Sequence, residues 1–136
     1  MTTNCAFCDI IKNSPTNIIA ENDYAIAFLP RKMESFAHTL IVSKKHYENI
    51  FDIPENDLKN LMIFLQNIAK SYKSKLWATG INILNANWKD AQQSVFHIHF
   101  HLIPRFPNDN LDLRPKFHQY DWKNENIIQE IKKKLI

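Results

Sequence analysis

The chain has 136 residues, a length that predicts a single domain over residues 1–136. Hydrophobic residues make up 45% of it and aromatic residues 12%, so a buried core is expected. No apolar run approaches the ~18 residues of a membrane span, and the N-terminal residues have neither the basic head nor the apolar core of a secretory signal. These features predict a cytoplasmic protein with no membrane association.

The net charge of +3 at pH 7 raises the question of nucleic-acid binding. The lysines are scattered, however, and the densest run, residues 132–134, falls at the end of the chain, where cations suit the dipole of a helix C-terminus. We therefore expect no nucleic-acid partner. The single glycine, Gly80, excludes P-loop and dinucleotide-binding loops, which need several glycines at fixed spacing. Any bound phosphate must be held by side chains and a few backbone amides.

The first half of the chain predicts a short helix, three strands and one long helix. The segment CAFCDIIKN is typical of one or two helical turns. Short strands are expected at 18–21 and 24–29, turned at Asn22-Asp23, and a third at 38–43. The long helix begins near Pro54, with Asp52 as its cap, because the apolar residues that follow repeat at helical spacing.

The second half predicts two further strands and a C-terminal helix. The strands are expected at 80–86 and 96–104, and residues 124–136 form an amphipathic helix. The apolar residues of this helix are Ile127, Ile128, Ile131 and Leu135. Strands that precede and follow one long helix indicate an α+β fold with a mostly antiparallel, five-stranded sheet.

Three of the six histidines alternate with apolar residues in VFHIHFHLIPR, residues 95–105. These histidines are His97, His99 and His101. Successive side chains of a strand point to opposite faces, so the imidazoles share one face and the apolar residues between them form core on the other. Such imidazoles serve either as metal ligands or in covalent catalysis, with one of them attacking phosphorus. The strict alternation disfavours incidental surface histidines.

Cys5 and Cys8 form a C-x2-C pair in a chain with no other cysteine. In a cytosolic protein this spacing favours zinc over a structural disulfide. A redox role would need a thioredoxin-like βαβ context that is not evident. Two thiolates supply half of a tetrahedral site, so two histidines are required to complete it. If His97 is one of them, His99 and His101 stay free for chemistry.

The segment HIHFHLIPR resembles the signature of the histidine-triad nucleotide-binding superfamily. FCDIIKN resembles the opening segment of that family, AHTLIVSKKHYENIFDI its strand with a following basic-histidine turn, and QSVFHIHFHLIPR its catalytic strand. The resemblance covers nearly the whole chain and implies the histidine-triad fold, which dimerises into one continuous sheet. It also implies action at the α-phosphate of purine nucleotide conjugates, phosphoramidates or dinucleoside polyphosphates, through a nucleotidyl-histidine intermediate.

The resemblance assigns roles to individual positions. His99, the middle histidine, matches the nucleophile, and His101 matches the residue that contacts the phosphate. His97 holds the first triad position, and His38 matches the histidine that supports the nucleophile from the neighbouring strand. Ser94 matches the hydroxyl that contacts the phosphate and the leaving group. Further residues of the nucleotide site are Gln93 and the apolar walls Phe7, Ile10, Phe28 and Leu29. For these four walls, core packing explains the sequence equally well.

Zinc-bearing relatives use the C-x2-C pair, the histidine after the basic turn and the first triad histidine. These positions correspond to Cys5, Cys8, His46 and His97, so the resemblance implies one structural zinc ion per chain. Without the cysteines, His46 would be interpreted as a surface histidine. His118 matches no family position and is expected at the surface.

The chain departs from the family pattern around the nucleotide. Pro30 stands where an Asp or Asn commonly holds the ribose hydroxyls, and Ala86 stands where the family has an Asn, although asparagines flank it. Trp88 and Gln92 replace usual glycines of the loop before the catalytic strand, where backbone amides approach a ligand most closely at glycine. These departures bear on substrate identity more than on reaction type.

We expect a homodimeric, zinc-containing nucleotide hydrolase or transferase. One alternative is a nucleotide-binding or partner-binding protein whose altered pocket has reduced or lost turnover. A second alternative is a mononuclear metal hydrolase that uses all three triad histidines and loses its activity when a chelator removes the metal. A nucleotidyl adduct on His99 separates the enzyme from the pure binder.

Overall fold

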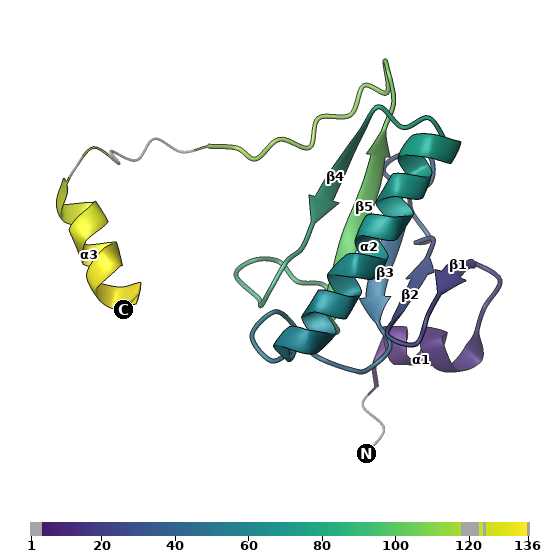
Figure 1. Ribbon diagram of the computed structural model, residues 1–136, viewed down its shortest axis with the longest axis horizontal. Coiled ribbons are helices and arrows are strands. Elements are labelled where there is room, and N and C mark those ends of the chain that lie inside the picture. Colours follow the sequence, from purple (N-terminus) through teal and green to yellow (C-terminus); the bar gives the residue numbers. More distant parts are fainter. Residues whose placement is uncertain (1–3, 118–122, 124, 136) are drawn as a thin grey trace.

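A five-stranded antiparallel sheet forms the body of the computed structural model, which describes residues 4–117, 123 and 125–135 (Figure 1). Its strands in chain order are β1 Ile18–Glu21, β2 Ala25–Phe28, β3 Thr39–Ser43, β4 Gly80–Leu84 and β5 His99–Arg105. They lie in the order β1-β2-β3-β5-β4, and each neighbouring pair is antiparallel. The helices are α1 Ala6–Asn13, α2 Glu55–Lys75 and α3 Glu125–Leu135. The predicted α+β class and five-stranded sheet are confirmed.

Two hydrophobic clusters lie on opposite faces of this sheet, one under α2 and one under α1. Strand β3 is buried along its whole length and contributes to both clusters. Ile41 belongs to the cluster under α2, whereas Leu40 and Val42 belong to the cluster under α1. The apolar run Leu40–Val42 suits a position covered on both faces. Figure 1 shows α2 lying across one face of the sheet.

Strand β5 lies between β3 and β4, and its Phe100 and Leu102 belong to the cluster under α2. His99 pairs with Val42 and His101 pairs with Leu40, and residues paired across strands share a face. Phe100, between the two histidines, belongs to the cluster under α2. The structure therefore shows the alternation that the sequence predicts, with the imidazoles on the α1 face.

The N-terminus of α2 differs from the prediction. Pro54 is the N-cap residue, and no side chain caps the helix by a hydrogen bond. The Asp52 carboxylate instead accepts hydrogen bonds from the backbone amides of Glu48 and Asn49, at 3.0 and 2.9 Å. The predicted cap is wrong because these amides of the preceding turn take up the carboxylate oxygens.

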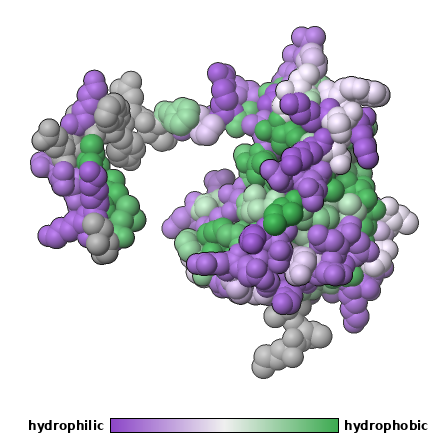
Figure 2. Space-filling view, viewed as in Figure 1, coloured by the Kyte–Doolittle hydropathy of each residue, from purple (hydrophilic) through white to green (hydrophobic). Residues whose placement is uncertain are grey.

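Helix α3 confirms the predicted C-terminal helix. Figure 1 shows it apart from the sheet, and Figure 2 shows hydrophobic surface along its side facing the body. The side chains of Ile128, Ile131 and Leu135 are 38%, 52% and 80% exposed. His118 lies outside the described residues. None of the described helices combines the length and the apolar character needed to cross a membrane.

Candidate functional site

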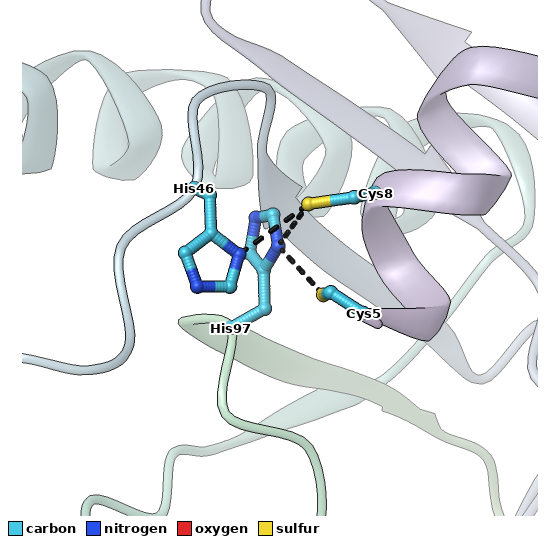
Figure 3. A group of neighbouring side chains, drawn as sticks. All are labelled: Cys5, Cys8, His46 and His97. Atoms are coloured by element: carbon cyan, nitrogen blue, oxygen red, sulfur yellow. Dashed lines mark hydrogen bonds between the residues drawn. The ribbon is translucent and has the colours of Figure 1, made fainter. Parts of the chain in front are cut away.

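Two cysteines and two histidines converge on one point between three segments of the chain (Figure 3). Cys5 immediately precedes α1 and Cys8 lies in its first turn, whereas His46 follows β3 and His97 lies just before β5. One ligand atom of each residue lies within 4.8 Å of those of the other three. The fold therefore brings together the four residues that the sequence predicts as metal ligands.

The distances within this cluster match a tetrahedral site. The Cys5 Sγ lies 3.4 Å from the His97 Nδ1, and the Cys8 Sγ lies 3.6 Å from the same nitrogen and 3.3 Å from the His46 Nδ1. With ordinary zinc–sulfur and zinc–nitrogen bond lengths, the sulfur–nitrogen edge of a tetrahedron is about 3.5 Å. No side chain has to move far for the four atoms to surround one ion.

The hydrogen bonds of His97 leave its Nδ1 free to be a ligand. Its Nε2 lies 2.7 Å from the backbone carbonyl oxygen of Ser43 and donates to it, so the proton of the neutral imidazole is on Nε2. Burial lowers the pKa of His97 to about 4, which keeps the imidazole neutral. In metal-binding histidines, a hydrogen bond from the ring nitrogen that does not bind the metal fixes the tautomer and the ring orientation.

The thiol of Cys8 also fits a metal site. Burial, followed by the neighbouring Cys5, raises the pKa of Cys8 to about 11. At neutral pH such a thiol stays protonated unless a cation is present, because metal binding deprotonates cysteine. The donor set of two sulfurs and two imidazole nitrogens therefore fits a metal ion that prefers sulfur and nitrogen.

The position of His97 differs from the prediction. We expected a strand over 96–104 with all three histidines on it, but β5 begins at His99. The backbone amide of Ile98 donates to the Tyr47 carbonyl oxygen at 2.7 Å, and this bond to the turn after β3 holds the segment outside the ladder. His97 consequently reaches the cysteines, while His99 and His101 remain on the sheet.

His99 presents one free nitrogen. Its Nδ1 donates to the backbone carbonyl oxygen of His97 at 2.8 Å, so the Nε2 carries the lone pair. The side chain is 4% exposed, and the ring of Phe7 packs edge-on against it with centroids 5.1 Å apart. Burial lowers the pKa of His99. A neutral imidazole with a fixed ring and an unused lone pair is a nucleophile or a base.

His101 and His38 form a hydrogen-bonded pair beside His99. The backbone amide of Glu34 donates to the His38 Nδ1 at 3.0 Å, so the proton of His38 is on Nε2 and is donated to the His101 Nδ1 at 2.9 Å. The proton of neutral His101 is then on Nε2, which makes that nitrogen a donor. His38 was expected to support the nucleophile from the neighbouring strand; its hydrogen bond goes to His101, whose ring centroid lies 5.3 Å from that of His99.

The predicted apolar walls separate into two groups. Phe7 and Phe28 are buried in the cluster under α1, with ring centroids 5.5 Å apart, and Ile10 packs against that cluster. Leu29 is half-buried and follows the end of β2. Three of the four walls therefore lie together on the histidine face of the sheet.

Gln93 and Ser94 lie in the loop between β4 and β5. The Gln93 side chain accepts from the Trp88 amide at 2.8 Å and donates to the carbonyl oxygens of Glu48 and Val95 at 2.6 and 3.0 Å. It holds the loop in place, and its contact with a nucleotide stays a prediction. Ser94 is exposed. Sequence reasoning missed the backbone partners of the histidines, because a backbone carbonyl or amide leaves no signal in residue identity.

Comparison with known proteins is consistent with this geometry. A family model described as the HIT domain matches residues 12–108. The protein named "Protein hit" of Bacillus subtilis is 35% identical over 137 residues, which cover 97% of this chain and 94% of that protein. Adenosine 5'-monophosphoramidase HNT1 of Saccharomyces cerevisiae is 38% identical over 102 residues, covering 74% of this chain and 62% of the yeast protein.

Solved structures show the same fold. A HIT family member from Bacillus subtilis has a TM-score of 0.84 at 32% identity, covering 98% of this chain and 99% of its own. A zinc-bound histidine triad family protein from Mycobacterium smegmatis has a TM-score of 0.75 at 32% identity, covering 85% and 84%. Because the family model spans well over half of the sequence, the chain belongs to the HIT domain family.

Proposed function

We propose that this protein is a nucleotide-binding hydrolase or transferase that acts at the α-phosphate of purine nucleotide conjugates through a nucleotidyl-histidine intermediate on His99. The observation that carries the proposal is the free Nε2 of a neutral, oriented imidazole, since the Nδ1 of His99 is taken by the His97 carbonyl oxygen. The yeast relative named as an adenosine 5'-monophosphoramidase supports the substrate class.

The two chemical steps use the same nitrogen. Attack forms a bond between the His99 Nε2 and the α-phosphorus and breaks the bond from phosphorus to the leaving group. Water then attacks the same phosphorus and breaks the phosphorus–nitrogen bond, which releases the nucleoside monophosphate and restores the imidazole. A neighbouring donor aimed at the phosphate oxygens stabilises the charge that develops there, and the Nε2 of His101 supplies it. Ser94 contacts the phosphate and the leaving group.

The substrate would bind on the α1 face of the sheet. The cluster of Phe7, Ile10 and Phe28 supports an apolar wall for a purine next to His99, with Leu29 at the end of β2. Pro30 has no side-chain acceptor for the ribose, so ribose binding would depend on neighbouring groups. Phosphoramidates and dinucleoside polyphosphates both present the required α-phosphate.

One zinc ion per chain would be held by Cys5, Cys8, His46 and His97. Four protein ligands leave no open position, so the role of the metal would be structural. These ligands would join the N-terminal end of α1 to the turn after β3 and to the segment just before β5. The zinc-bound relative from Mycobacterium smegmatis supports this identity.

The protein would act as a homodimer that pairs through β4. This strand is at the edge of the sheet, and Ile83 and Leu84 on it are 47% and 40% exposed. A strand edge with apolar side chains is covered in stable proteins. Pairing two copies of β4 across a twofold axis covers this edge in both protomers.

A nucleotide-binding protein with reduced or lost turnover is the second candidate. The observation that favours it is the loop before β5, where Trp88 and Gln92 have φ angles of 79° and 63°, a region that glycine adopts most readily. Bulky residues there reshape the space next to Ser94.

Covalent trapping distinguishes the two functions. The protein would be mixed with adenosine and guanosine phosphoramidates and dinucleoside polyphosphates, quenched, and analysed by intact and peptide mass. An enzyme gives a nucleotidyl adduct on the peptide that contains His99, and His99→Ala gives none. Tight nucleotide binding without any adduct or turnover would establish the binder.

A further inference from the structure

The segment that follows β5 is held beside β4 by one arginine. The Arg105 guanidinium donates to both carboxylate oxygens of Asp109, at 2.8 and 2.9 Å, and to the Asn82 side chain on β4 at 2.8 Å. It also donates to the carbonyl oxygen of Leu111. Figure 1 shows residues 106–117 running from the end of β5 past β4 and away from the sheet. The chain therefore leaves the sheet across the edge that β4 forms.

Helix α3 stands on the β4 side of the sheet, apart from it, with an uncovered apolar face (Figure 1). Ile128, Ile131 and Leu135 recur at helical spacing on this face and are 38%, 52% and 80% exposed. Figure 2 shows that this face is directed toward the body. A helix of only 11 residues is marginal in water unless its apolar face is packed. The apolar face of α3 therefore needs a surface to pack against.

The groove between α2 and β4, called the α2–β4 groove, is an apolar surface of matching size. Met62, Ile63 and Ile83 are among the side chains that line a hollow of about 470 Å³ there, and Ile63 and Ile83 are each 47% exposed. A second hollow of about 350 Å³ adjoins it along α2. Together they follow the helix over residues 59–73, about 21 Å, whereas α3 is about 16 Å long. The α2–β4 groove is therefore long enough to hold α3.

The charges of the two helices favour one direction of packing. Helix α2 has Glu55 and Asp57 in its first turn, whereas α3 has lysines at 132–134 in its last turn. An antiparallel arrangement brings these lysines toward the carboxylates, and it also places the negative end of each helix dipole near the positive end of the other. The two helices are thus complementary in charge as well as in apolar surface.

We infer that α3 is exchanged between two copies of the chain, and that its apolar face packs in the α2–β4 groove of the other copy. Within one chain the two surfaces stand apart (Figure 1). A copy paired through β4 lies on the side of the sheet where α3 stands, and a twofold axis makes the exchange reciprocal. The inference rests on the homodimer of the proposed function and adds a second contact to it.

The test is a charge swap between two copies of the full chain. Ile131→Glu places a carboxylate on the apolar face of α3, and Ile63→Lys places an ammonium group in the α2–β4 groove. Each variant alone should raise the dissociation constant of the dimer roughly tenfold or more, because a buried isoleucine contact is lost. An equimolar mixture of the two should recover most of the affinity. In the mixed dimer one contact pairs Glu with Lys, and the other is wild type.

Two matched controls add the same charges elsewhere on the same helices. Gln129→Glu lies on the polar side of α3, and Asn67→Lys is exposed on α2 outside the residues that line the groove. Neither control should change the dissociation constant measured by sedimentation. Recovery only in a chain that carries both Ile131→Glu and Ile63→Lys, and not in the mixture, would place α3 on its own chain and overturn the inference.

The failure of the exchange is distinguishable from the failure of the proposed function. A dimer that neither Ile131→Glu nor Ile63→Lys weakens would overturn the exchange and leave pairing through β4 in place. A wild-type monomer would contradict both the pairing and the exchange. The nucleotidyl adduct on His99 is measured independently of either result.

Hydrogen exchange of the wild-type protein keeps the inference testable if the charged variants unfold α3. The amides of α3 should be protected in the dimer and lose protection when the protein is diluted below the dissociation constant, because a short helix without packing opens readily. Protection that persists in the diluted monomer would assign α3 to its own chain. Protection that appears only with phosphatidylglycerol vesicles would assign it to a lipid surface, and either outcome overturns the inference.

Discussion

The Nε2 of His38 donates a hydrogen bond of 2.9 Å to the Nδ1 of His101. The Nδ1 of His38 is itself held by the Glu34 backbone amide, so a single backbone group determines the proton positions of two imidazoles. His101 is left with its proton on Nε2, and the Nε2 of neighbouring His99 carries a lone pair. An N–H donor and an unprotonated imidazole nitrogen thus lie on two neighbouring rings, whose centroids are 5.3 Å apart.

Replacing His99 with Ala should abolish turnover, because among the described residues the Nε2 of His99 is the free imidazole nitrogen whose ring neighbours His101. Nucleotide binding should persist, since the apolar wall and His101 are retained. Steady-state kinetics and calorimetric titration with AMP check this, and His99→Asn serves as a control that leaves less empty space beside Phe7. Turnover within tenfold of wild type would contradict the covalent mechanism.

Replacing His38 with Ala should lower kcat about fivefold with little change in KM, because the loss of one positioning hydrogen bond is worth about 1 kcal/mol. His38→Gln keeps a side-chain N–H near the position of the His38 Nε2, which bonds the His101 Nδ1, and should recover part of the loss. A merely structural role for His38 would lower the stability of both variants and leave kcat unchanged. Melting temperatures and kinetics measured together decide between these roles.

Elemental analysis of protein purified without chelator should find one zinc ion per chain. Cys8→Ser should lower the melting temperature and loosen α1, because metal binding in such a site contributes to the free energy of folding. Any loss of activity should be indirect, and Cys5→Ser should behave in the same way. Protein without zinc, or a Cys8→Ser variant as stable as wild type, would leave the cysteines as ordinary buried thiols.

Stability should fall as the pH is lowered from about 6.5 to about 4, and His101 should contribute to this fall. Burial, followed by the neighbouring His99 and His38, lowers the pKa of His101 to about 4 from its ordinary 6.5. Between these values the unfolded chain binds a proton that the folded chain does not, so the free energy of unfolding rises with pH in this window.

Denaturant unfolding at several pH values from 4 to 7.5 measures this dependence. His101→Gln removes one of the contributing imidazoles and should make the slope shallower than that of wild type. An unchanged slope would show that His101 is protonated equally in the folded and unfolded chains, and a steeper slope that folding raises its pKa.

Sedimentation should show a dimer, and Ile83→Lys should convert it to a monomer. Ile83 is 47% exposed on the edge strand β4, and a buried lysine at a pairing edge opposes association. Ile19→Lys is the matched control, because Ile19 is 44% exposed on β1 at the opposite edge of the sheet. A wild-type monomer at micromolar concentration, or equal dissociation of both variants, would contradict pairing through β4.

Much of the fold and the identity of the metal cluster could be predicted from the sequence. Alternation in residues 98–102 predicted two faces of a strand, and helical spacing after Pro54 predicted α2, because both periodicities follow directly from backbone geometry. The pair of Cys5 and Cys8 predicted a need for two histidines through ligand chemistry alone. These inferences depend on side-chain type and spacing, which the sequence states.

Only the tertiary structure decided which nitrogen of each histidine carries the proton and where the fold departs from the predicted elements. The tautomers of His97 and His38 depend on the Ser43 carbonyl oxygen and the Glu34 amide, and every residue offers such groups, so the sequence does not distinguish them. The withdrawal of His97 from β5 and the engagement of Asp52 in a turn likewise arise from backbone partners that are distant or competing. Residue identity determines side-chain chemistry, whereas the folded structure determines which of many equivalent backbone groups bonds each side chain.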